Sequence, residues 1–383
     1  MDYDFKELVN QLVKLEDTTD SSQGVLCMIT DAVKEKRKHM LNDCTIREAV
    51  NWCKNNNKNN SNNFFYDISS DDELEDIDSY SKWTHPLYGH ISKWDTSHVT
   101  NMRELFINSK LNQPIGNWDT GRVTDMSGMF DDSIFNEDIG NWNTSRVTNM
   151  KSMFCNSKFN KPIGNWDTSK VTNMYNLFYN SDFNQPIGDW DTSNVTNMGI
   201  MFCISVFNKP IGNWDTSSVK SMFSMFCRAE FNHPIGNWDT SSVTNMPAMF
   251  CNSKFNQPIG NWNTGNATNM YSMFKDSMFN EDIGKWDTSK VTNMVSMFEK
   301  SVFNQPIGKW DTSQVNNMGR MFKKSRFNHH IDGWDIRKVQ NMYKMFKDSK
   351  FNQHIDSWDN INDTYRDDGS DSDCLTILKL DDY

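Results

Sequence analysis

The side chains that could hold a metal or act as nucleophiles have few suitable partners near them in this sequence. His329, His330 and His354 come nearest to a metal-binding group, since the last two stand 24 residues apart. The eight cysteines form no Cys-x-x-Cys pair, so the sequence predicts neither a zinc ribbon nor a thioredoxin-type redox centre. We expect free thiols rather than disulfides, and no metal or cofactor site.

Sequence patterns for phosphate, zinc and serine chemistry are absent as well. The chain has no GxxxxGK[ST], GxGxxG, HExxH or GxSxG stretch. These patterns cradle phosphates, hold catalytic zinc or present a serine nucleophile. We therefore expect a protein that is not an enzyme, with no catalytic residues.

Charge and hydropathy restrict the kind of partner. The 383 residues carry a formal net charge of -11, which gives no basic footprint for nucleic acid. No apolar run approaches the roughly 18 residues that span a bilayer. The N-terminus MDYDFKELVN is acidic, where a secretory signal would be basic and then apolar. We expect no nucleic-acid partner, no membrane insertion and an intracellular location; the oligomeric state stays open.

A period of 24 residues runs through most of the chain without an insertion. Each unit opens with phenylalanine or leucine and carries tryptophan at its eighth position, and the pattern runs from Leu87 to Trp358. A fixed period of 20 to 50 residues is the signature of a solenoid, in which each unit buries its apolar face against its neighbours. The sequence therefore predicts a repeat solenoid of about twelve units, of the α/β class.

Within a unit, the spacing predicts one short strand and one short helix. Met174, Leu177 and Phe178 follow helical spacing, and Asn173 before them is a suitable N-cap. The stretch 162–166, Pro-Ile-Gly-Asn-Trp, is too short for a helix. We predict a brief strand there that stacks in parallel on its equivalents, about 4.8 Å apart.

Two sets of repeated side chains are expected to be structural. The tryptophans keep phase with the isoleucines, which favours a core role over a platform for sugars. The asparagine after each opening phenylalanine predicts a ladder of amides between units, with ligand binding as the alternative. The aspartate row, as at Asp167, fits an Asx turn better than a calcium ladder, because Asn143 and Asn263 replace the charge. The structural residues are Trp166, Trp190, Trp214, Trp238, Asn160, Asn184 and Asn208.

The repeated residues resemble a known family. WDTSxVTNMxxMF followed by FNQPIGNW is similar to the BspA-like leucine-rich repeats, of the DUF285 type, found in bacterial and mycoplasma surface proteins and in giant DNA viruses. Residues 87–358 carry the resemblance. It implies a right-handed, leucine-rich-repeat-like coil that serves adhesion or protein recognition. It implies no catalytic residues and, if the viral likeness holds, a host protein as partner.

The flanks differ from the repeats. Residues 1–54 show helical spacing at 5–12 and 25–33, and Thr45 with Glu48 fits a capping box for a third helix ending about Cys53. This segment is expected either to cap the array or to bind a partner itself. Residues 55–86 are Asn-rich and then acidic, as in a linker, and residues 359–383 form an acidic tail.

Recognition, if it occurs, should use the positions that vary between units. One row of variable residues is basic at both ends, and a second row follows the Met-Phe pair. We predict a non-enzymatic scaffold for protein interaction, with a surface adhesin as the alternative; the sequence does not name the partner. The predicted interaction residues are Arg122, Arg146, Lys170, Lys290, Lys338 and Tyr179.

Overall fold

The computed structural model describes residues 40–59, 83–355, 357 and 358. Contacts between residues divide the chain after Val99 into two units. The helices predicted at 5–12 and 25–33, most of the predicted linker and the tail from residue 359 lie outside the described residues.

In the described part of the N-terminal unit, a helix is combined with a small hairpin. Helix α3 spans Asp43–Asn59, strand β1 (Thr84–His85) pairs antiparallel with β2 (Gly89–His90), and the 3-10 helix η2 (Ile91–Lys93) follows. Helix α3 supplies the buried side chains of Ile46, Ala49 and Val50, and η2 supplies Ile91, whereas the residues of β1 and β2 are half-buried or exposed. No helix in the described part of the chain is long and apolar enough to cross a bilayer.

Helix α3 begins earlier and ends later than the sequence predicts. The side-chain oxygen of Asn42 accepts the backbone N–H groups of Cys44 (2.9 Å) and Thr45 (3.1 Å), and the Thr45 hydroxyl accepts the N–H of Asn42 (2.8 Å). Asn42 is therefore the N-cap, and Thr45 rather than Glu48 completes the reciprocal pair. The helix also continues past residue 54, where the side chain of Asn56 donates to the carbonyl of Trp52 (2.8 Å).

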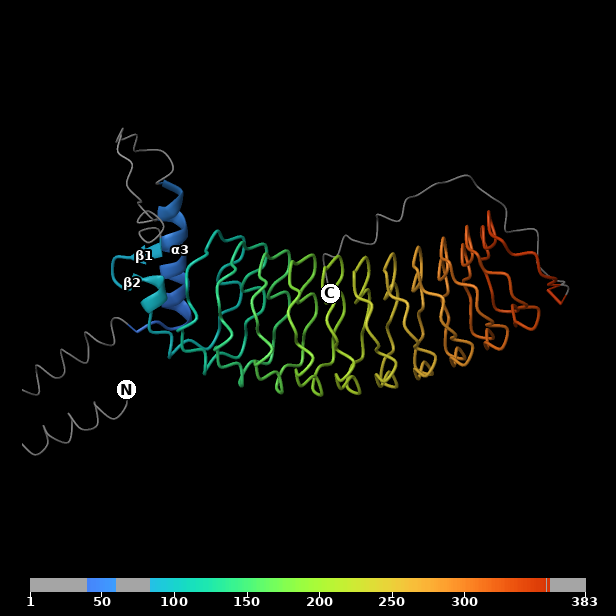
Figure 1. Cartoon of the computed structure of the whole chain (residues 1–383), viewed down its shortest axis with the longest axis horizontal. Helices are drawn as coiled ribbons and strands as arrows, with labels where there is room; N and C mark the ends of the chain where they lie inside the picture. The colour runs from blue at the N-terminus through green and yellow to red at the C-terminus, as the bar shows by residue number, and fades with distance from the viewer. Residues whose placement is uncertain (1–39, 60–82, 356, 359–383) are drawn as a thin grey trace, which may run out of the picture. The chain divides into compact units, whose positions relative to one another are not determined.

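The second unit is a stack of similar coils, one for each 24-residue repeat (Figure 1). Adjacent coils meet at one parallel bridge, between equivalent residues such as Asn149 and Asn173, and this bridge repeats from Asn101 to Asn341. From Thr100 on, the described residues form isolated bridges and turns, with no helix or multi-residue strand. The chain is a repeat protein, but its units lack the predicted strand and helix.

The segment predicted to be helical is a run of tight turns that bond to the next coil. The N–H groups of Met174 and Asn176 donate to carbonyls 23 residues later, those of Asn197 (3.0 Å) and Gly199 (2.9 Å). The intervening N–H of Leu177 closes a turn on the carbonyl of Met174 (3.3 Å). The helix prediction is wrong because alternate N–H groups bond to the next coil, where a helix would bond them to its own preceding turn.

These turns place non-glycine residues in the left-handed region. Each unit has two residues with positive φ, at its eighteenth and twenty-second positions, such as Asn176 (φ 62) and Asn180 (φ 48). A positive φ at the third residue is a feature of a type II turn, which favours glycine or asparagine. Ile200 and Ile204 also adopt this conformation (φ 60 and φ 58), which is costly for a β-branched side chain.

The predicted strand at 162–166 is also a turn. The N–H of Trp166 donates to the carbonyl of Ile163 (3.2 Å), and the same carbonyl accepts the indole N–H of Trp190 from the next coil (3.1 Å). A Cβ on Gly164 would lie 2.9 Å from the carbonyl oxygen of Pro186. The strand prediction is wrong because this carbonyl serves a turn and an indole, and the glycine allows the next coil to approach closely.

Columns of aromatic rings fill the interior of the coils. Phe154 and Phe178, in adjacent coils, have ring centroids 5.7 Å apart and planes 2° apart, and Phe159 lies 4.3 Å from Phe154. Trp142 and Trp166 stack at 6.4 Å. All five side chains are at most 4% exposed. Each coil therefore completes the core of its neighbours, as repeat architectures require.

Replacing Trp238 by alanine should lower the free energy of unfolding by about 3 to 5 kcal/mol, because it removes a buried ring from the core. The substitution also removes the donor to the carbonyl of Ile211 (3.1 Å). Denaturant titration measures the change. Met278→Ala is the control, since this side chain is 59% exposed and its loss should cost less than about 0.5 kcal/mol. Equal effects of the two substitutions would contradict a buried role for the tryptophan.

Replacing Lys300 by asparagine should raise the free energy of unfolding by about 0.5 to 1 kcal/mol, because asparagine tolerates the left-handed region better than lysine. Lys300 is exposed and has φ 58. Lys170→Asn, at an exposed position without positive φ, is the control and should change little. In a helix the same change at Lys300 would destabilise slightly, so a loss of stability there would contradict the turn.

Candidate functional site

Four positions of each unit form a surface that we call the variable face. They are positions 17, 18, 21 and 22, counted from the residue that opens the unit. In the unit that opens at Phe159 they are Tyr175, Asn176, Tyr179 and Asn180. From coil to coil these positions carry acidic, aromatic, aliphatic, thiol and basic side chains. The variable face is therefore the part of the array whose chemistry changes along the stack.

The turns determine which side chains reach this face. Met174, Leu177 and Phe178 point into the core and are 0% exposed, whereas the four variable positions between and after them are half-buried or exposed. The backbone N–H groups of this segment already donate between coils or within turns. A partner that binds here must therefore contact side chains, because the backbone offers no free edge for strand addition.

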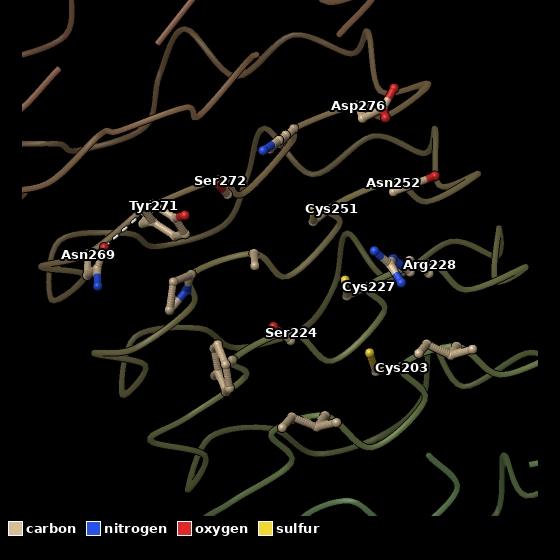
Figure 2. A pocket seen from close by; sticks show the side chains of 16 residues that line it. Cys203, Ser224, Cys227, Arg228, Cys251, Asn252, Asn269, Tyr271, Ser272 and Asp276 are labelled. Carbon is tan, nitrogen blue, oxygen red and sulfur yellow. Dashed lines mark hydrogen bonds between the residues drawn. The ribbon is translucent and has the colours of Figure 1, made fainter. Parts of the chain in front are cut away.

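A groove of about 420 Å³ lies on the variable face, across the four coils whose units open at residues 183, 207, 231 and 255. Figure 2 shows its lining side chains, which come from successive coils. Phe223 is half-buried and reaches the groove from the second of these coils. The main apolar lining residues are Ile200, Ile204, Phe223, Pro247, Ala248 and Tyr271.

Three thiols follow one another along the groove, from Cys203 through Cys227 to Cys251 (Figure 2). The hydrogen bond with Cys203, followed by burial, raises the pKa of Cys227 to about 12, while contact with Cys251 acts the other way. The hydrogen bond with Cys227 and burial also raise the pKa of Cys251. Because the thiolate is the reactive form, Cys227 and Cys251 act as small apolar groups at neutral pH.

The charge of the variable face changes sign along the stack. Before the groove, the acidic residues Glu104, Asp131 and Asp132 outnumber the basic residues Arg103 and Lys151, and burial raises the pKa of Asp131. Beyond the groove, six cations occupy the face in the last three full units. Burial and the nearby charges of Arg320, Lys344 and Lys324 lower the pKa of Lys323, against the attraction of Glu299. The six cations are Lys300, Arg320, Lys323, Lys324, Lys344 and Lys347.

An ion pair marks the change from apolar to basic. The ammonium of Lys275, which lines the groove, lies 3.4 Å from a carboxylate oxygen of Glu299, and their side chains are 16% and 5% exposed. Removing one partner of such a buried pair leaves the other charge without compensation. The pair therefore lies at the end of the groove that adjoins the basic coils.

The predicted interaction residues are divided between two surfaces. Tyr179 lies half-buried on the variable face, and burial raises its pKa. The others form a row at position 12 of their units and do not line the groove. Within this row, Lys290 donates to Asn266 and Lys338 donates to Gln314, each at 2.7 Å. The exposed residues of the row are Arg122, Arg146, Lys170, Lys290 and Lys338.

The predicted structural residues lie within the stack. Trp166, Trp190, Trp214 and Trp238 are 3 to 4% exposed, so their faces are not open to a sugar. The side-chain oxygen of each ladder asparagine accepts the backbone N–H of its equivalent in the next coil. The distance is 2.9 Å both from Asn184 to Asn160 and from Asn208 to Asn184. The predicted ladder residues are half-buried or exposed; they are Asn160, Asn184 and Asn208.

The aspartate row forms Asx turns. The carboxylate of Asp167 accepts the N–H (3.0 Å) and hydroxyl (2.6 Å) of Ser169, and these bonds lower the pKa of Asp167. Among the described residues, no three His, Cys, Asp or Glu side chains lie close enough together to hold a metal ion. His330 and His354 are exposed, and a ring nitrogen of His329 lies 3.0 Å from the carbonyl oxygen of Asn304.

Most of the groove was not predicted from the sequence. The second variable row is position 21, which includes the three thiols, whereas positions 17, 18 and 22 supply Phe223, Ile200 and Ile204. These positions also vary between units, position 17 most and position 22 least. The groove could have been found by comparing all units at every position, although the helix prediction would have directed these side chains differently.

Alkylation of Cys227 by iodoacetamide at pH 8 should be at least about 100-fold slower in the folded chain than in urea, because an unfolded thiol has a pKa near 8.5. In the folded chain the pKa of about 12 leaves very little thiolate. Mass spectrometry of the peptide 221–228 measures the rate. The rate should keep rising above pH 9; a plateau below pH 9 would contradict the raised pKa.

Comparison with known proteins agrees with the repeat pattern. The family model described as "Mycoplasma protein of unknown function, DUF285" matches residues 75–182, 173–282, 228–325 and 277–368. These overlapping matches cover more than half of the chain. No match was found among curated proteins or among solved structures. The matches confirm the resemblance that the repeated residues indicate: the chain belongs to the DUF285 family of repeat proteins.

Proposed function

We propose that this protein is a non-enzymatic scaffold, a solenoid that binds a protein partner on its variable face. The observation that carries the proposal is the groove of about 420 Å³, in which apolar side chains of adjacent coils lie together on the face. Concave apolar sites are where proteins bury the anchor side chains of their partners. The protonated thiols that line the groove support binding over nucleophilic chemistry.

The charges on either side of the groove indicate the chemistry of the partner. Before the groove the face carries three acidic and two basic side chains, and after it six basic and two acidic ones. A partner segment with apolar residues, bordered by carboxylates on the side of the later coils, would match both features. Such complementarity fixes the direction of binding and excludes segments with the opposite charge order.

Replacing Phe223 by aspartate should weaken binding of the partner at least about tenfold, because it places a charge at the apolar centre of the contact. The tagged chain, its Phe223→Asp variant and an Arg146→Glu control are used to isolate partners from the native cells. Arg146 is exposed and lies outside the groove. Titration of each chain with the purified partner then measures its affinity.

The proposal predicts that the partner is lost with Phe223→Asp and kept with Arg146→Glu, while thermal unfolding shows that both chains remain folded. A partner that binds both variants equally would place recognition elsewhere. A partner lost only with Arg146→Glu would place the binding site on the row at position 12.

A further inference from the structure

The variable face has a fixed order of properties, read from its C-terminal end toward its centre. The last three full units present six cations at positions 18, 21 and 22, against the carboxylates of Glu299 and Asp348. Glu299 is 4% exposed and pairs with Lys275. The next coils inward present the apolar groove. A chain that enters from the last coil would therefore pass cations first and apolar side chains second.

The residues that follow the described part of the array have the matching order. After Trp358, residues 363–373 contain five aspartates and one arginine, and residues 375–380 read Leu-Thr-Ile-Leu-Lys-Leu. We propose that residues 375–380 dock in the groove of the same chain, with the aspartates of 363–373 against the basic coils. This inference goes beyond the proposed function, because it does not depend on any partner.

The connecting chain is long enough. The groove lies four to seven coils before the coil of Trp358. At the 6.4 Å between stacked tryptophan rings, seven coils span about 45 Å, while the 17 residues from Trp358 to Leu375 reach about 56 Å when extended. The segment therefore reaches every coil of the groove without unfolding any repeat.

The chemistry of the two surfaces favours this occupant. Phe223 and Ile204 are half-buried apolar side chains that a covering segment would remove from water. Three of the four leucine and isoleucine residues of the segment fall within its last four positions, next to a single lysine. Carboxylates that lie along the cations give the segment one direction, and a shared chain raises its effective concentration near the groove. Docking of this kind would compete with an external partner for the same side chains.

Cys374, next to the segment, allows a direct test in the full chain. Cys374 is labelled with a benzophenone maleimide and irradiated, and tryptic peptides that cross-link to the peptide 367–379 are identified. The proposal predicts cross-links to peptides 221–228 and 229–254, which contain Phe223 and Pro247. The yield should not change on dilution, and a mixture of isotopically light and heavy chains should give no mixed products.

Matched variants separate docking from chance contact. Ile377→Asp with Leu378→Asp should reduce the groove cross-links at least tenfold, whereas Ile361→Asp, in the same tail, should leave them unchanged. Lys300→Glu with Lys324→Glu should reduce them several-fold at low salt, and Lys170→Glu, outside the face, should not. All of these residues are exposed or lie outside the described part, so the substitutions spare the core.

Three results would overturn the proposal. Cross-links confined to the peptide 351–366 would mean that the tail covers the last coil. Mixed light and heavy products would mean that it docks on a second copy of the chain. Groove cross-links that survive Ile377→Asp with Leu378→Asp would mean that the apolar segment does not hold it there. None of these results bears on whether an external partner depends on Phe223.

Discussion

The hydrogen bond from alternate backbone N–H groups to the next coil is the constraint on which this structure depends. It runs from Met174 to Asn197 and from Asn176 to Gly199, and it recurs along the stack. The remaining N–H groups of the segment close turns, so the buried backbone is satisfied without a helix or a sheet. This arrangement requires positive φ twice in each unit. The strain is tolerated because each coil is held by its neighbours on both sides.

The same hydrogen bonds separate the core from the variable face. They turn Met174, Leu177 and Phe178 inward, where the aromatic columns stack at spacings such as 5.7 Å, and leave the intervening side chains outside. The core residues recur from unit to unit, whereas the residues of the variable face differ. The groove and the basic coils that follow it result from these differences.

Much of the core could be predicted from the sequence, but the backbone that carries it could not. The 24-residue period and the Asx turn at Asp167 follow from local patterns that the structure retains. Met174, Leu177 and Phe178 are spaced as in a helix because two tight turns also bring these residues to one side. The turns differ from a helix in their hydrogen bonds, which reach carbonyls 23 residues away. Local spacing of the side chains does not reveal such bonds.

One signal for the turns was present. Position 22 is asparagine or aspartate in most units, as in Asn108, Asp132 and Asn180, and these residue types favour the left-handed region. The groove could not be predicted without the turns, because the turns direct positions 17, 18 and 22 outward. The charged residues of the face can be read from the sequence. That they lie in order along one surface became clear only from the structure.

Amide hydrogen exchange of methionine-labelled protein would test the central claim most directly. With ¹⁵N only in methionine, the spectrum contains the methionine after each bridge residue, which is the donor to the next coil, together with the other methionines of the chain. Stacked turns predict slow exchange for these amides, near the rate of global unfolding. In a helix capped by Asn173 the first N–H would have no partner, so exchange within minutes would contradict the account. The donors are Met102, Met126, Met150, Met174, Met198, Met222, Met270, Met294 and Met318.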